Sequence, residues 1–228
     1  PIENASDAIN IIENGEKWER VLSDKFKNTN DWLLQIITSD SRSKFLKDRM
    51  PSPDELVLDI GAGWGQFSIP LAKSNKVCSL EPTPERLNII KSIAQQEKVS
   101  DNMYFIGTDY LDIEFQTKFD LILCIGVLEW MGSFRKEQSP GKVQNEFLKK
   151  SRSELSDKGK LIIGIENRLG LKYIMGARDD HHGFEDVMIY GEDFAERFFG
   201  EDFVDARRCV VHSLPEYKEM LRTAGFQN

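Results

Sequence analysis

The stretch "ELVLDIGAGWGQFSIPLA", residues 55–72, places three alternate glycines between two apolar runs. The first run, residues 56–60, is almost continuously apolar, which is typical of a strand buried on both faces of a sheet. Gly61, Gly63 and Gly65 permit backbone torsions that other residues avoid, and they let a ligand approach the main chain closely. A helix is expected from about residue 66. The stretch therefore predicts a strand, a ligand-binding turn and a helix.

The glycine spacing distinguishes two classes of adenosine-containing ligand. The dinucleotide-binding pattern G-x-G-x-x-G requires a third glycine at position 66, which is Gln66 here. The pattern is instead D-x-G-x-G-x-G and begins at Asp59. It resembles motif I of the class I S-adenosylmethionine-dependent methyltransferases. The resemblance implies a Rossmann-like fold that binds S-adenosylmethionine and releases S-adenosylhomocysteine.

Strand and helix patterns alternate along the rest of the chain. Alternation of this kind predicts parallel strands joined by right-handed crossovers. The expected fold class is therefore α/β, a Rossmann-like, doubly wound and mostly parallel sheet. The antiparallel strand pair that completes the sheet in this family is expected to be missing, because only a helix near residues 213–225 remains. Further strands are expected at 76–80, 103–106, 120–125 and 160–165, and helices at 84–97 and 142–155.

An acidic residue follows the second predicted strand. Glu81 lies 20 residues after Gly61, and an acid ~20 residues beyond a glycine loop can accept hydrogen bonds from both hydroxyls of an adenosine ribose. Because S-adenosylmethionine and nicotinamide dinucleotides share that ribose, Glu81 supports adenosine binding without choosing between them. Thr83 and Pro84 are the predicted N-cap and first residue of the next helix.

The methyltransferase resemblance assigns further residues. In the family, an acid after the third strand binds the adenine amino group, and Asp109 matches it. The end of the fourth strand borders the methionine part of the cofactor and the acceptor, so Glu129 and Trp130 are predicted to bind the acceptor. The residues expected to bind the cofactor are Asp59, Gly61, Ala62, Gly63, Gly65, Glu81, Pro82, Thr108, Asp109, Tyr110, Cys124 and Gly126.

Residues 166–191 read ENRLGLKYIMGARDDHHGFEDVMIYG. They resemble a narrower set of bacterial methyltransferases associated with surface-polysaccharide gene clusters, which carry E-N-[RK]-x-G-L-K-Y and D-H-[ST]-G elements; His182 departs from the usual hydroxyl residue. We expect an acceptor-side insertion in which His181 is catalytic as a neutral base, or else only orders its loop. Asn167 and Arg168, with His182, are expected to bind a polar acceptor or to hold the loop. The adjacent histidines lack the i,i+4 spacing of a helical metal site, so no metal is predicted.

Composition limits the partners and the compartment. The 228 residues carry a net charge of −8, which argues against a nucleic-acid partner. No apolar run approaches the ~18 residues that a membrane span requires. Cys78, Cys124 and Cys209 form no CxxC pair, and free thiols are typical of a cytoplasmic protein.

Two domains are predicted, a helical extension or cap over residues 1–50 and a methyltransferase domain over 51–228. An apolar stripe, expected to cover the cofactor cleft or the back of the sheet, supports the extension: Trp18, Val21, Leu22, Trp32, Leu33 and Ile36. The expected function is methyl transfer to a hydroxyl or other polar group of a small-molecule or glycan-like acceptor. A non-catalytic S-adenosylmethionine-binding module and a nucleotide-dependent oxidoreductase are the alternatives. The chain is also expected to belong to a longer polypeptide, whose other domains are possible partners.

Overall fold

The computed structural model describes residues 5–27, 31–39, 51–181, 183–200 and 208–227. The chain divides into two units. The first contains residues 1–123 and 154–162, and the second contains residues 124–153 and 163–228.

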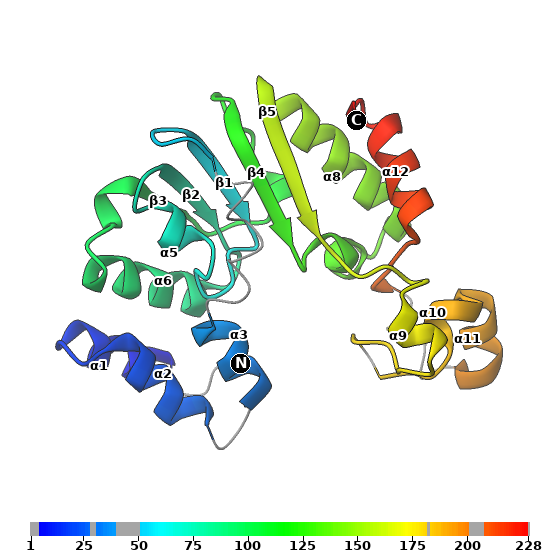
Figure 1. Cartoon of the computed structure of the whole chain (residues 1–228), viewed down its shortest axis with the longest axis horizontal. Helices are drawn as coiled ribbons and strands as arrows, with labels where there is room; N and C mark the ends of the chain where they lie inside the picture. The colour runs from blue at the N-terminus through cyan, green and yellow to red at the C-terminus, as the bar shows by residue number, and fades with distance from the viewer. Residues whose placement is uncertain (1–4, 28–30, 40–50, 182, 201–207, 228) are drawn as a thin grey trace. The chain divides into compact units, whose positions relative to one another are not determined.

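A sheet of five strands lies mainly in the first unit, and its strands all run in the same direction (Figure 1). β1 pairs in parallel with β2, and β2 with β3. The order reverses between β1 and β4, and open parallel sheets bind ligands beyond the carboxyl ends of their strands at such a reversal. In the described residues the strands are β1 (Leu56–Ile60), β2 (Lys76–Leu80), β3 (Met103–Ile106), β4 (Phe119–Ile125) and β5 (Leu155–Gly164), in the order β3-β2-β1-β4-β5.

The central strands form the core because their sequences are almost continuously apolar. Val57, Leu58 and Val77 are fully buried. Helix α5 (Ser68–Leu71) packs against β2, and helix α6 (Pro84–Gln96) packs against β3. Two 3-10 turns, η2 (Ser100–Asn102) and η3 (Tyr110–Asp112), precede and follow β3. The connections thus place the glycine loop between β1 and α5.

Within the described residues, three helices precede the sheet: α1 (Ala5–Glu13), α2 (Trp18–Phe26) and α3 (Asp31–Thr38). α1 packs against α6. Trp18 is held there, because its indole N–H donates to Glu97 Oε1 at 3.0 Å and its backbone N–H donates to Gln96 Oε1 at 2.9 Å. The predicted cover over the cofactor stays a prediction. The predicted boundary at residue 50 and the side chains of Trp32 and Leu33 lie outside the described part of the chain.

The second unit consists mainly of helices. They are η4 (Leu128–Trp130), α7 (Met131–Phe134), α8 (Pro140–Glu154), α9 (Leu171–Ile174), α10 (Val187–Tyr190), α11 (Glu192–Phe199) and α12 (Leu214–Thr223). The fully buried Gln144 of α8 donates to the carbonyls of Leu128 and Val210, at 3.2 and 2.9 Å. Gln144 therefore joins η4 to the segment before α12. None of the described helices combines the length and apolar character needed to cross a bilayer.

The last helix begins where the sequence predicts it. Ser213 is the N-cap of α12, and Pro215 lies in its first turn. Glu216 Oε2 accepts hydrogen bonds from the backbone N–H and the hydroxyl of Ser213, at 2.7 and 2.6 Å. Two other predicted elements differ in extent. The helix after the glycine loop is confined to the four residues of α5, because β2 already begins at Lys76. The last strand, β5, begins at Leu155 instead of residue 160.

Candidate functional site

The glycine loop joins β1 to α5 in the first unit. Gly61, Gly63 and Gly65 have positive φ angles of 67°, 59° and 83°, which other residues rarely adopt. The backbone N–H groups of Gly61 and Ala62 both donate to the carbonyl of Leu80, at 2.8 and 3.0 Å, and fix the loop to the end of β2. A Cβ on Gly65 would lie 3.0 Å from a side-chain carbon of α5, whereas a Cβ on Gly63 would have nothing nearer than 3.6 Å. Glycine is therefore needed for close packing at position 65 and leaves accessible backbone at position 63.

Glu81, the predicted ribose ligand, follows β2 directly and is 3% exposed. Its Oε2 accepts the N–H of Gly63 at 2.9 Å, and its Oε1 accepts the N–H of Thr83 at 3.0 Å. A carboxylate has about four acceptor positions, so both oxygens keep capacity for ligand hydroxyls. Thr83 and Pro84 occupy the N-cap and N1 positions of α6, as predicted, and Pro82 is exposed beside them. Glu81 therefore joins the glycine loop to the start of α6.

Asp59, the motif acid, is buried in β1. Its Oδ2 accepts a hydrogen bond from the hydroxyl of Ser68 at 2.6 Å, and the hydroxyl of Ser79 donates to Ser68 Oγ at 2.7 Å. Burial raises the pKa of Asp59 to about 7, although the hydrogen bonds from Ser68 oppose this rise. Asp59 thus connects β1 to α5, and its predicted contact with the amino group of the cofactor stays a prediction.

The third predicted cofactor segment follows β3. Thr108 and Asp109 are half-buried, and Asp109 Oδ1 accepts the N–H of Leu111 at 2.8 Å, which caps η3. Tyr110 is buried, and its hydroxyl donates to Glu154 Oε2 at 2.6 Å. The contacts of Tyr110 are those of a core residue. Of these three predicted residues, Thr108 and Asp109 keep surface that an adenine could contact.

Trp64 connects the glycine loop to the N-terminal helices, a link that sequence reasoning missed. Its buried ring meets Phe26 of α2 edge-on, with ring centroids 5.4 Å apart and an interplanar angle of 82°. The guanidinium carbon of Arg86 lies 5.8 Å from the centroid of the Trp64 ring. Because Trp64 stands between two glycines of the loop, the loop conformation and the position of α2 depend on each other.

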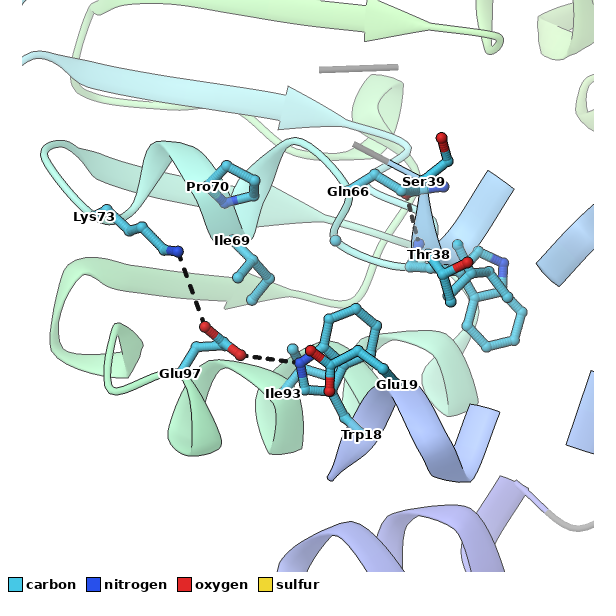
Figure 2. Close-up of a pocket in the computed structure, with 13 residues that line it drawn as sticks. Trp18, Glu19, Thr38, Ser39, Gln66, Ile69, Pro70, Lys73, Ile93 and Glu97 are labelled. Carbon is cyan, nitrogen blue, oxygen red and sulfur yellow. Dashed lines mark hydrogen bonds and ion pairs between the residues drawn. The ribbon is translucent and has the colours of Figure 1, made fainter. Parts of the chain in front are cut away.

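A cavity of about 200 Å³ lies beside this loop and is lined by residues of α2, α3, α5 and α6 (Figure 2). Glu97 accepts the indole N–H of Trp18 and lies 3.9 Å from the ammonium group of Lys73, as Figure 2 shows. Pockets for cofactors and other small molecules typically measure about 300–1,000 Å³. The carboxylates predicted to bind the cofactor do not line this cavity. The cavity is therefore not assigned to the cofactor.

The fourth predicted segment belongs to the second unit. Cys124 is fully buried at the end of β4. Gly126 has a φ of 70°, and its N–H donates to the carbonyl of Gly164 at 2.8 Å. A Cβ on Gly126 would lie 3.8 Å from Glu129 Oε1. The turn after β4 thus passes close to the carboxylate of Glu129.

His181, the predicted catalytic residue, lies among carboxylates of the second unit. Its Nδ1 is 3.4 Å from Asp179 Oδ1, and its Nε2 is 3.8 Å from Glu129 Oε1 and 3.8 Å from Glu166 Oε2. The backbone N–H of His181 also donates to Asp179 Oδ1, at 2.8 Å. The ring of Trp130 packs edge-on against the imidazole, with centroids 5.2 Å apart. These contacts fix the orientation of the imidazole.

The imidazole of His181 is positively charged at neutral pH. Burial lowers its pKa, but the neighbouring Asp179, Cys209 and Glu129 outweigh burial and raise the pKa to about 12. A histidine with this pKa already holds its proton at neutral pH and cannot accept another. The raised pKa disfavours the neutral base expected from the sequence, and the catalytic role of His181 stays a prediction. A charged imidazole can instead donate a hydrogen bond or stabilise developing negative charge.

The other predicted acceptor residues make contacts within the loop. Asn167 Oδ1 accepts the N–H of Leu169 at 3.1 Å. Arg168 donates from Nε to Glu216 Oε2 at 3.2 Å and from its backbone N–H to the carbonyl of His212 at 3.1 Å. These contacts match the loop-holding alternative. His182 lies outside the described residues.

Three residues around His181 were not predicted as site residues: Glu166, Asp179 and Cys209. Glu129 and Glu166 follow β4 and β5, which are neighbours in the sheet. Because the carboxyl ends of parallel strands meet at one edge, this topology was the signal that could have paired them. Asp179 is only two residues from His181. No local pattern points to Cys209.

Comparisons with known proteins agree with this architecture. Residues 57–140 match the family model described as "Methyltransferase domain". "Probable ribosomal RNA small subunit methyltransferase A" of Methanosphaera stadtmanae is 31% identical over 97 residues, which are 42% of this chain and 35% of that protein. The matched region is thus a minor part of that relative.

Two solved structures have a similar fold. A "putative O-methyltransferase" from Nostoc punctiforme PCC 73102 superposes with a TM-score of 0.55 at 16% identity, covering 100% of this chain and 63% of that one. A "possible exported protein" from Bordetella parapertussis superposes with a TM-score of 0.57 at 14% identity, covering 86% of this chain and 62% of that one. At these identities the likeness concerns the fold alone. Taken with the parallel sheet and its glycine loop, it shows that the chain has the Rossmann-like fold of class I methyltransferases, and residues 57–140 are similar to the methyltransferase-domain family.

Proposed function

We propose that this protein transfers the methyl group of S-adenosylmethionine to a hydroxyl or other polar group of a small-molecule or glycan-like acceptor. The observation that carries the proposal is the pairing of Glu81 with the glycine loop. A buried carboxylate at the end of β2 accepts the N–H of Gly63 and keeps acceptor positions for ribose hydroxyls. This is the arrangement expected of an adenosine site in a parallel sheet.

The first unit supplies the groups that would hold the cofactor. Glu81 would bind the ribose, and Asp109 with Thr108 would contact the adenine. The open backbone at Gly63 would lie under the methionine portion, with Asp59 near its amino group. When bound, the cofactor supplies a methyl group that is already electrophilic. The protein then has to hold the acceptor in line with that methyl group and exclude water.

The second unit supports a polar acceptor. Glu129, Glu166 and Asp179 surround the charged imidazole of His181. Carboxylates accept hydrogen bonds from hydroxyl groups, and an imidazolium donates one. Such groups suit a sugar-like molecule better than an apolar one. The likeness to enzymes of surface-polysaccharide clusters and a cytoplasmic location are parts of this proposal.

The relative named for ribosomal RNA raises an RNA acceptor as a second possibility. RNA binding draws on clustered Lys and Arg. This chain carries 38 acidic against 30 basic side chains. We therefore favour the small polar acceptor and use RNA as a comparison in the test.

The test is formation of S-adenosylhomocysteine by the full chain, followed by mass spectrometry, with monosaccharides, sugar nucleotides, oligosaccharides and RNA fragments as acceptors. The proposal expects turnover with a hydroxyl-rich small acceptor and a mass gain of one methyl group on it. The Glu81→Ala variant is the control for cofactor dependence. Cofactor binding without turnover on any acceptor would favour the non-catalytic module, and binding of a nicotinamide dinucleotide in place of S-adenosylmethionine would favour the oxidoreductase.

A further inference from the structure

Three metal-ligand side chains converge in the second unit. Glu129, Glu166 and His181 each offer one ligand atom, and these atoms lie within 4.8 Å of one another. His181 Nε2 is 3.8 Å from an oxygen of each glutamate. The sequence predicted no metal, because the adjacent histidines lack the spacing of a helical metal site; these three residues are far apart along the chain.

The separations among the three atoms suit an ion better than direct hydrogen bonds. A hydrogen bond from Nε2–H to a carboxylate oxygen measures about 2.7–2.9 Å, well below the observed 3.8 Å. Ligands held about 2.0–2.2 Å from a metal ion in tetrahedral or octahedral geometry lie roughly 3.0–3.5 Å apart. The imidazole nitrogen and each carboxylate oxygen would have to approach by about 0.3–0.8 Å to bind one ion.

Two carboxylate oxygens of the cluster are buried without a hydrogen-bond partner in the described structure: Glu129 Oε2 and Glu166 Oε2. Glu129 as a whole is 2% exposed. An unpartnered buried carboxylate oxygen is strongly unfavourable, and a bound cation removes that penalty. Glu129 Oε2 is not the oxygen that faces His181, so its lack of a partner is a separate observation from the three-way convergence and points to a cation among the same residues.

The surroundings of His181 also match those of a metal ligand. Metal-binding histidines usually hold their second ring nitrogen against a carboxylate, which fixes the ring orientation. Here Asp179 lies 3.4 Å from Nδ1 and accepts the backbone N–H of His181, so Nε2 faces the two glutamates. The side chain of Glu166 is 33% exposed, which gives an ion access from solvent.

We propose that Glu129, Glu166 and His181 form a site for one divalent transition-metal ion. One imidazole and two carboxylates suit Mn²⁺, Fe²⁺ or Zn²⁺. The ion would take the place of the imidazole proton, since histidine binds metals in its neutral form. Three protein ligands leave coordination positions open. If the proposed function holds, an oxygen of the acceptor could occupy one of them, and that extension alone rests on the proposed function.

The test uses Mn²⁺ alone with the full chain, in the absence of cofactor and acceptor, so that its result is independent of methyl transfer. Electron paramagnetic resonance measures free Mn²⁺ during a titration. We expect one bound ion per chain and at least tenfold weaker binding in Glu166→Gln and in Glu129→Gln. Glu137→Gln, which changes an exposed glutamate of the same unit, is the matched control and should bind as the wild type does. Because Glu129 is buried, circular dichroism checks whether the Glu129→Gln variant folds. Glu166 is partly exposed, so Glu166→Gln should fold normally and tests the site even if the Glu129 variant does not fold.

Asp179→Asn provides a second measurement. Asp179 is a positioning residue in this proposal, and loss of such a partner typically weakens metal affinity about 10–100-fold. Competition by Zn²⁺ for the same site should release the bound Mn²⁺ in the wild type. The proposal is overturned if the wild type binds no Mn²⁺, or if the glutamine variants bind it as tightly as the control does.

Discussion

Replacing Glu81 by alanine tests the glycine loop and the cofactor site in one variant. The buried carboxylate accepts backbone N–H groups of Gly63 and Thr83, at 2.9 and 3.0 Å. Hydrogen bonds to a charged partner are each worth about 1.5–3 kcal/mol. Both donor residues are half-buried, so water can partly replace the carboxylate. We therefore expect the free energy of unfolding to fall by about 2–3 kcal/mol, at or just below the lower end of the summed range of about 3–6 kcal/mol.

The cofactor measurement is separate from the stability measurement. Loss of the ribose contact should weaken S-adenosylmethionine binding by about 1–3 kcal/mol, which is about 5- to 150-fold in Kd. Urea unfolding without cofactor, monitored by circular dichroism, gives the free energy of unfolding. Calorimetric titration in the absence of urea gives the Kd for S-adenosylmethionine. Glu85→Ala changes an exposed acid in the first turn of α6 and is the matched control.

Two results would refute the reasoning about Glu81. If Glu81→Ala unfolds within about 0.5 kcal/mol of the Glu85→Ala control, the two backbone hydrogen bonds do not hold the loop. If its cofactor affinity equals that of the control, Glu81 is not the ribose ligand, whatever its effect on stability.

Three further predictions follow from the two units. Burial raises the pKa of Asp59 from 3.8 to about 7, so the folded state binds the proton more tightly than the unfolded state and stability falls as pH rises from about 4 to about 7. Between pH 5 and pH 8 the wild type should therefore lose about 3 kcal/mol that Asp59→Asn does not lose. Equal changes in urea stability of wild type and variant between these two pH values would contradict this. Gly65→Ala should destabilise by about 1–3 kcal/mol more than Gly176→Ala, because both glycines have positive φ but a Cβ at position 176 meets nothing within 4 Å; equal melting curves would argue against close packing of the loop. His181→Ala should lower turnover by about 10²-fold and leave cofactor affinity unchanged in calorimetry, and full turnover would reduce His181 to a residue that orders its loop.

The strands of the sheet were predictable where their sequences are continuously apolar. The strands at 56–60, 76–80 and 103–106 have the predicted bounds, because continuous apolar runs between turn residues allow few other structures. β5 begins at Leu155, earlier than predicted. The prediction missed its first half because that half is polar and lacks the apolar run that marks the other strands. Ser156 Oγ donates to Asp120 Oδ1 at 3.0 Å, and a Cβ on Gly159 would lie 2.7 Å from the carbonyl oxygen of Phe119. Pairing with β4 therefore sets this part of the strand, and no local hydrophobic pattern records it.

Some residues of the candidate site could likewise be predicted from the sequence, and others could not. Glu81 could be predicted because its distance from the glycine loop follows from the strand-helix-strand unit that connects them. The strand order could have paired Glu129 with Glu166, but no local pattern connects either glutamate, or Cys209, to His181. The charge of the imidazole depends on those partners. A sequence pattern therefore located the histidine but not the groups that raise its pKa, and its catalytic role stays a prediction.

Calorimetric titration of the wild-type chain with S-adenosylmethionine, and in parallel with a nicotinamide dinucleotide, tests the central claim most directly. We expect saturable binding of S-adenosylmethionine and of S-adenosylhomocysteine at one site per chain, with no heat of binding for the dinucleotide. Tight binding of the dinucleotide and none of S-adenosylmethionine would contradict the account.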